Sequence, residues 1–198
     1  MVFFKKLDAL KERYKNDTLT RPNGTLVLMP GKIPQGRHYI YAPLPRPIMD
    51  EFLIEPYSNR FPTSYAELLH HANGVSLYMM RLKHKRFTLA HAFLTVFGLP
   101  LTPPQYREHN GEEPFDLRIE DLSRHRDIPP SWLKFGVCAP PEYNFSHIEL
   151  FIDTQNEEIF ACKKEHSEIL WHWKNLDTCL CELCNKGELN EQEYQCPI

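Results

Sequence analysis

The segment over residues 61–78 constrains the fold most, because it contains a helix start, a helix end and a strand in immediate succession. Ser64 and Glu67 have the S-x-x-E spacing of a capping box, in which side chains satisfy free backbone donors at a helix start. Gly74 predicts the helix end, since glycine readily adopts the left-handed backbone conformation found there. The helix between them has one apolar face, formed by Tyr65, Leu68, Leu69 and Ala72. An extended pattern follows at 75–78, so the sequence predicts a helix that turns abruptly into a strand.

Strand-like segments also lie before and after residues 61–78. Besides 75–78, β-rich or alternating apolar patterns lie at 25–29, 38–41, 92–97, 132–138, 148–153 and 158–163. In residues 132–138 the alternation places Leu133, Phe135 and Val137 on one face. A regular alternation of strands with helices, which would predict a parallel sheet, is missing. The predicted class is therefore α+β, a single domain with a mostly antiparallel sheet of about five to six strands flanked by helices.

Amphipathic helices are predicted near both ends of the chain. The first covers residues 2–14, with an apolar face that contains Phe3, Leu7, Leu10 and Tyr14. The last follows Asn175, a residue typical of helix N-caps, and Gly187 is its predicted end. One stripe of this helix holds Leu176, Cys179, Leu180, Leu183 and Cys184. Residues 188–198 are acidic and weakly apolar, so we expect this tail to fray.

Composition and charge narrow the functional classes. A chain of 198 residues with 42% hydrophobic and 25% charged residues is typical of one globular domain. A net charge of -3 gives no general attraction to nucleic acid or to an anionic membrane. The basic run at 81–86 lacks interleaved aromatic residues, so we interpret it as a solvated loop. The most apolar stretch, 89–101, is interrupted by Gly98 and Pro100 and predicts no membrane span. The apolar run at 1–4 is too short for a signal peptide, so we expect a cytoplasmic protein with reduced thiols.

The cysteines are the strongest candidates for chemistry. Cys179, Cys181 and Cys184 form a C-x-C-x-x-C pattern, but Cys179 and Cys181 point about 200° apart on a helix and cannot face one ion. Cys179 and Cys184 share the apolar stripe, which favours core packing. A Cys-His nucleophile pair stays open, because such partners are neighbours in space rather than in sequence. His70 and His71 are adjacent and lack the i, i+4 spacing at which two imidazoles share a metal. We therefore predict no catalytic residue, cofactor or metal site.

The order of several motifs resembles the SUKH superfamily, which groups a fungal regulator of cell-wall synthesis with many bacterial proteins. The motifs that carry the resemblance are, in order, Leu44 with 49–53, 61–69 with 72–74, 77–78, 94–100, 128–136, 148–153 with 159–160, and 173–176 with Leu180 and Leu183. They extend over a core from about residue 40 to 186, preceded by a helix and hairpin extension at 1–39. The resemblance implies a single SUKH-like domain over 1–198, an α+β fold with a predominantly antiparallel sheet, and no catalytic residues.

Many bacterial proteins of that superfamily are immunity proteins, which bind and neutralise a cognate toxin. The resemblance thus implies a non-enzymatic protein-binding module whose partner is a co-encoded toxin, without nucleic acid, membrane or cofactor. Self-association stays open. One alternative is a regulatory or scaffold protein related to the control of cell-wall synthesis. Another is a zinc- or thiol-dependent enzyme that uses the C-terminal cysteines.

Candidate partner-binding residues are aromatic and acidic side chains in predicted loops and turns, because aromatic anchors dominate protein interfaces. They are Tyr106 in a proline-rich segment, Glu142 and Tyr143 in a turn, Asp153 at the hairpin, and Trp171 before the last helix.

Overall fold

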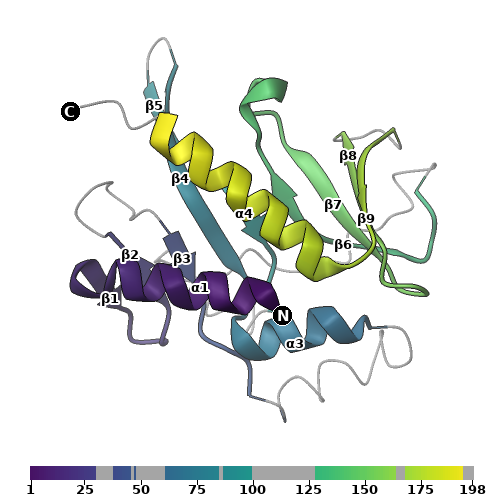
Figure 1. Cartoon of the computed structure of the whole chain (residues 1–198), viewed down its shortest axis with the longest axis horizontal. Helices are drawn as coiled ribbons and strands as arrows, with labels where there is room; N and C mark the ends of the chain where they lie inside the picture. The colour runs from purple at the N-terminus through teal and green to yellow at the C-terminus, as the bar shows by residue number, and fades with distance from the viewer. Residues whose placement is uncertain are drawn as a thin grey trace, which may run out of the picture.

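The computed structural model describes residues 1–29, 38–45, 47, 61–84, 87–99, 128–163 and 168–193. Over these ranges the chain forms one α+β domain in which nine strands make a single open sheet, accompanied by three α-helices (Figure 1). The strands follow one another in sequence order, and each pairs antiparallel with the next. The α+β class and the antiparallel sheet are confirmed, whereas the predicted count of about five to six strands is too low.

The strands are β1 (Thr18–Thr20), β2 (Leu26–Leu28), β3 (His38–Ile40), β4 (Val75–His84), β5 (Phe87–Val96), β6 (Trp132–Cys138), β7 (Ile148–Asp153), β8 (Ile159–Lys163) and β9 (Ile169–Trp173). The α-helices of the described ranges are α1 (Val2–Arg13), α3 (Thr63–His71) and α4 (Leu176–Glu193). The two edge strands are short, with 3 residues in β1 and 5 in β9. Neither of these two strands is predicted from the sequence.

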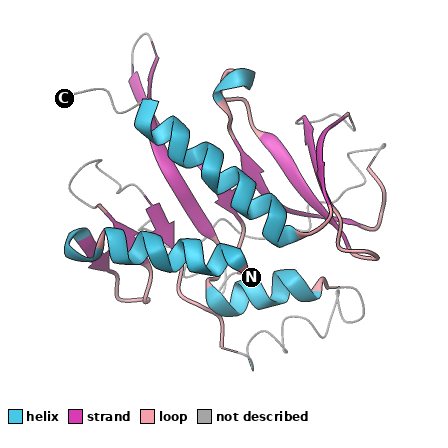
Figure 2. Cartoon of the chain, viewed as in Figure 1, coloured by secondary structure: helices cyan, strands magenta, loops and turns pink. Residues whose placement is uncertain are grey.

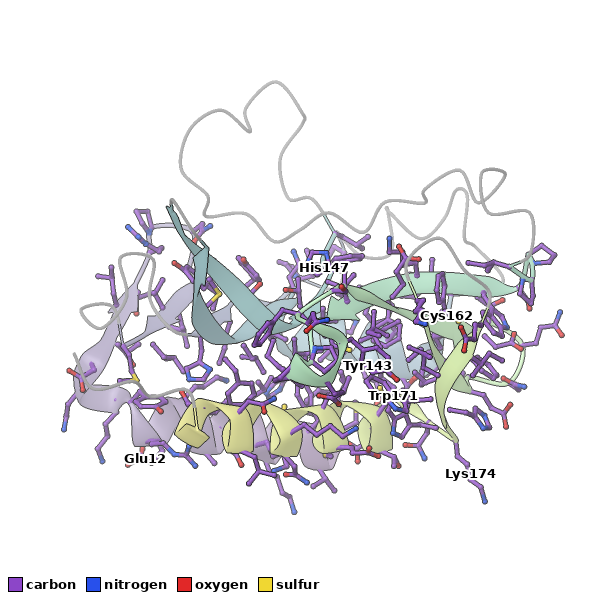
Figure 3. All side chains as sticks on the ribbon, turned by 90° about the horizontal axis from the view of Figure 1, so that it is seen from above. Glu12, Tyr143, His147, Cys162, Trp171 and Lys174 are labelled. Atoms are coloured by element: carbon purple, nitrogen blue, oxygen red, sulfur yellow. The ribbon has the colours of Figure 1, made fainter. Side chains whose placement is uncertain are left out.

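The helices cover one face of the sheet (Figure 2). α1 and α4 run side by side, and seen from above both lie on the same side of the strands (Figure 3). The predicted apolar stripes of both helices face the sheet. The buried residues that the helices contribute to the common core are Phe3, Leu7 and Leu10 of α1, Tyr65, Leu68 and Leu69 of α3, and Leu176, Cys179, Leu180, Leu183 and Cys184 of α4. No helix in the described ranges is long and apolar enough to cross a membrane.

The basic run lies in a long hairpin between β4 and β5. Lys83 pairs with Thr88, and His84 pairs with Phe87. The predicted solvated loop is therefore wrong for residues 81–84, which continue β4, while 85–86 lie outside the described residues. Cross-strand pairing decides the length of a strand more than its local charge does.

A β-bulge in β6 changes which of its side chains face the helices. The register with β7 shifts between Lys134 and Gly136, so that Phe135 and Cys138 both pack in the core. Val137, which was predicted to share a face with Phe135, is only half-buried, and that prediction is wrong. One extra residue in a strand reverses the inward and outward pattern beyond it.

The N-terminus of α3 is capped by a carboxylate from a distant turn. The free N–H groups of Thr63 and Ser64 donate to the Glu157 carboxylate at 2.7 and 3.2 Å. The predicted capping box of Ser64 and Glu67 is wrong, because Pro62 is the N-cap and Ser64 lies within the first helical turn. The start of α3 therefore depends on the β7–β8 turn.

The N-terminus of α1 is held in the same way, by α4. The N–H groups of Val2 and Phe3 donate to the carboxylate of Asp177 at 2.9 and 2.8 Å. The start of α4 itself is capped locally, since Asn175 Oδ1 accepts from the N–H of Thr178 at 2.9 Å. This N-cap is confirmed as predicted.

The turn from α3 into β4 is confirmed, and Gly74 is required there. Gly74 has a φ of +89°, and a Cβ atom at this position would lie 2.7 Å from the carbonyl oxygen of Val96. The side chain of Asn73 pairs with the backbone of Leu99, donating to its carbonyl and accepting from its N–H, both at 2.7 Å. The Asn73 side chain thus supplies the two hydrogen bonds that a neighbouring strand would otherwise make to the backbone of Leu99.

The last helix continues beyond Gly187 to Glu193, so the predicted end at Gly187 is wrong. The expected fraying is also wrong for 188–193, while 194–198 lie outside the described residues. Gly187 faces the buried ring of Tyr78, and a Cβ atom at this position would lie 2.3 Å from Tyr78 Cδ2. The glycine therefore allows α4 to pass over the ring and does not end the helix.

We expect Gly187→Ala to lower the free energy of unfolding. In an ordinary helix interior alanine is more stable than glycine by about 1 kcal/mol. Here the added methyl group meets the Tyr78 ring, and such overpacking costs about 1–3 kcal/mol. Denaturant unfolding followed by circular dichroism measures the change, with Leu189→Ala at an exposed position of α4 as the control. A more stable Gly187→Ala variant would contradict the close packing of the helix on Tyr78.

The cap on α3 makes stability depend on the ionisation of Glu157. Partial burial favours its neutral form, but hydrogen bonds from Ser64 and Thr63 outweigh this effect and hold the pKa of the Glu157 carboxyl below its usual value. A carboxyl with a lowered pKa in the folded state stabilises the protein above its unfolded pKa, and this contribution disappears as the pH falls through the folded pKa.

We therefore expect Glu157→Gln to lower the free energy of unfolding at neutral pH by roughly 1 kcal/mol or less, because the cap is partly solvated. The difference from the wild-type protein should vanish as the pH falls through the folded pKa of Glu157, which lies below the usual value of a glutamate. Chemical denaturation at several pH values measures both effects. Glu168→Gln, at an exposed carboxylate, is the control. A difference that is independent of pH would contradict a charged cap.

Candidate functional site

Two segments far apart in the sequence bring an aromatic pair together. Tyr143 ends the short 3₁₀ helix η4 (Pro141–Tyr143), and Trp171 lies in the edge strand β9. Their rings meet edge to face, with centroids 5.8 Å apart (Figure 3). Both side chains are half-buried, whereas neighbouring Glu142 is exposed. The pair is therefore partly accessible and its geometry is favourable.

Side chains of α4 hold the aromatic residues of β9. Lys186 Nζ lies over the Trp171 ring, 4.4 Å from its centroid, in a cation–π contact. The Trp173 indole N–H donates to Glu182 Oε2 at 2.7 Å, and Lys186 lies 3.4 Å from the other oxygen of Glu182. We call Tyr143, Trp171, Trp173, Glu182 and Lys186 the Tyr143–Trp171 cluster.

The turn that positions Tyr143 is built from proline and two left-handed residues. Pro140 is extended and Pro141 begins η4, which suits the fixed φ of proline. Asn144 and Phe145 then adopt φ values of +53° and +58° and turn the chain back toward β7. The carbonyl of Tyr143 accepts from the N–H of Ser146 at 3.0 Å, which closes the turn. Glu142 is left at its exposed tip.

The structure joins three of the predicted partner-binding residues and places a fourth elsewhere. Glu142, Tyr143 and Trp171 belong to one surface, as described above. Asp153 lies at the other end of β7, where its carboxylate accepts from the N–H of Gln155 at 3.0 Å and supports the hairpin turn. Tyr106 lies outside the described residues.

Sequence reasoning missed the residues of α4 that complete the cluster. Glu182 and Lys186 are spaced i, i+4 outside the apolar stripe, a pattern that indicates an ion pair on the surface of a helix. That spacing is visible in the sequence, but it does not reveal which ring the lysine covers. The contact of Trp171 with Tyr143 needs the register of the sheet, which the sequence does not provide.

Burial suppresses the reactivity of the described thiols. Loss of solvent raises the pKa of Cys138 and of Cys184 to about 12, and that of Cys162 to about 11. The pKa values of fully buried Cys179 and half-buried Cys181 are raised for the same reason. Thiolate, the form that attacks substrates and binds metals, is therefore scarce at neutral pH. The predicted core packing of Cys179 and Cys184 is confirmed.

The Tyr143–Trp171 cluster can provide contact area, a cation and carboxylates. In the described part of the chain, no group of three or more His, Cys, Asp or Glu residues is placed to hold a metal ion. What the arrangement can do chemically is bind another molecule through a rigid aromatic surface with charged neighbours.

Comparison with known proteins finds no matching family model, no matching curated protein and no matching solved structure. The resemblance to the SUKH superfamily therefore stays a prediction from the sequence motifs.

Proposed function

We propose that this chain is a non-enzymatic protein-binding module, and specifically an immunity protein that binds and neutralises a co-encoded toxin. The observation that carries the binding role is the Tyr143–Trp171 cluster. Residues that dominate protein interfaces are enriched in tryptophan and tyrosine, and they are held rigidly before binding. The toxin partner comes from the resemblance to the SUKH superfamily.

The cluster has the parts that an interface centre requires. Trp171 is half-buried between Tyr143 and Lys186, so little side-chain freedom is lost when a partner covers it. Glu142 and Glu182 provide carboxylates at its border. Charged groups at a border influence the rate and specificity of association more than the affinity. A basic surface on the partner suits this arrangement.

The first test is binding to the protein encoded by the neighbouring gene. We expect a stable complex between the two purified proteins, with Trp171→Ala weakening it at least about 30-fold, which corresponds to about 2 kcal/mol. Isothermal titration calorimetry measures both affinities. Circular dichroism at the same temperature must show that the variant is folded.

His172→Ala is the matched control, because His172 is the next residue of β9 and its exposed ring stacks on Phe160. We expect this control to bind within about 3-fold of the wild-type protein, as most interface-distant substitutions do. Equal losses for both variants would contradict a site centred on Trp171. Absence of any complex with a co-encoded protein would overturn the immunity role.

Two alternatives make different predictions. A regulatory or scaffold role related to cell-wall synthesis predicts a protein partner but no neighbouring toxin gene. A zinc- or thiol-dependent enzyme predicts stoichiometric zinc or a reactive thiolate in the purified protein. The raised pKa values of the thiols from Cys138 to Cys184 disfavour the thiol enzyme.

A further inference from the structure

A second group of polar side chains lies buried where the end of α4 crosses β3 and β4. His38 at the start of β3 has no exposed side-chain surface, and the side chain of Glu191 in α4 is 6% exposed. Buried ionisable groups are costly unless they are paired and hydrogen-bonded. Their presence here needs a physical reason, and neither residue belongs to the Tyr143–Trp171 cluster.

The ring of His38 connects three elements. Its Nδ1 accepts a hydrogen bond from the backbone N–H of Tyr78 in β4 at 3.2 Å. Its Nε2 lies 3.6 Å from Glu191 Oε1. The ring also stacks on Tyr14, with centroids 5.4 Å apart, and meets the Tyr78 ring edge to face at 5.0 Å. His38 thus joins α4 to β4 through its two nitrogens.

These contacts define the protonation state of the ring. A backbone N–H can only donate, so Nδ1 must carry no proton, and the single proton of the neutral ring is on Nε2, which faces Glu191. A doubly protonated ring would place a second donor opposite the N–H of Tyr78. Two donors cannot satisfy each other, so the hydrogen bond to β4 would be lost.

The charged and titratable groups around His38 come from each neighbouring element. In the described residues they are Tyr14 and Arg13 at the end of α1, Tyr78 of β4, and Cys184, Glu188 and Glu191 of α4. Arg13 lies 3.6 Å from Glu188 and interacts electrostatically with Glu191. Burial raises the pKa of the Tyr78 hydroxyl, and it raises that of the Cys184 thiol to about 12. Both therefore stay neutral at physiological pH, and histidine is the side-chain type whose charge ordinarily changes in that range.

We propose that His38 is a proton-sensitive latch that fastens the last turns of α4, residues 187–193, onto β3 and β4. In the neutral state its two nitrogens bind Tyr78 and face Glu191. Protonation removes the bond to Tyr78, while the added charge attracts the ring to the Glu191 carboxylate. The ring then no longer joins the two elements, and the end of α4 is released from β4. Acid therefore loosens the end of α4 at a higher pH than the one at which the rest of the fold opens.

Hydrogen exchange of backbone amides, corrected for the intrinsic effect of pH, tests the latch directly. Between about pH 8 and pH 5.5, on either side of an ordinary histidine pKa of about 6.5, we expect protection of Tyr78 and of residues 187–193 to fall about tenfold. In His38→Asn the Asn oxygen can accept from the N–H of Tyr78 but cannot titrate. We expect this variant to lose the pH response. A wild-type response that persists unchanged in His38→Asn would overturn the proposal.

Further variants separate His38 from the other titrating groups. Glu191→Gln cannot ionise but keeps an acceptor for Nε2–H, so we expect it to retain the pH response; loss of the response would assign the effect to Glu191. His71→Gln removes a half-buried histidine that stacks on Phe4, and it should also retain the response.

Direct observation of the His38 ring covers the case in which His38→Asn does not fold. Nitrogen-15 NMR of the imidazole in the wild-type protein should show Nε2 protonated and Nδ1 free at pH 8. A proton on Nδ1 would overturn the proposal. None of these measurements requires a partner protein, so their outcome is independent of the proposed immunity role.

Discussion

The packing of α4 across the sheet is the interaction on which the rest of the structure depends. Its stripe from Leu176 to Cys184 is fully buried and fills the centre of the core. Burial of side chains of this size stabilises a fold by about 1.5–3 kcal/mol each. The other faces of the same helix fix the remaining parts. Asp177 caps α1, Gly187 leaves room for the Tyr78 ring, and Lys186 covers Trp171. One helix thus organises both the core and the candidate site.

The helix starts show how strongly the elements depend on one another. α1 and α3 both obtain their caps from carboxylates remote in the sequence, Asp177 and Glu157. Each helix can therefore be capped only after the C-terminal half of the chain has folded against it. α4 has its own N-cap in Asn175 and contributes the buried stripe from Leu176 to Cys184 to the core. A locally capped helix that also caps α1 is consistent with its central position.

The sequence predicted correctly those elements whose formation depends on residues close together in the chain. The apolar faces of α1 and α4, the β7–β8 hairpin and the Gly74 turn all agree with the structure. The errors occur where contacts between residues far apart in the sequence determine the local structure. Ser64 is not a cap because Glu157 is present, Val137 changes face because of a bulge, and Gly187 continues a helix because Tyr78 lies beneath it. For the site, aromatic residues could be predicted as anchors, but their pairing depends on the β8–β9 register.

The most direct test of the account uses the three tryptophans of the chain as reporters. Trp171 and Trp173 lie in the Tyr143–Trp171 cluster, whereas Trp132 packs with Phe151 and Cys162 in a separate cluster away from the helices. With fluorotryptophan incorporated, fluorine NMR gives one signal for each. On addition of the co-encoded protein that we propose as the partner, we predict that the Trp171 signal shifts and the Trp132 signal stays in place. A shift of Trp132 with Trp171 unchanged would contradict the account.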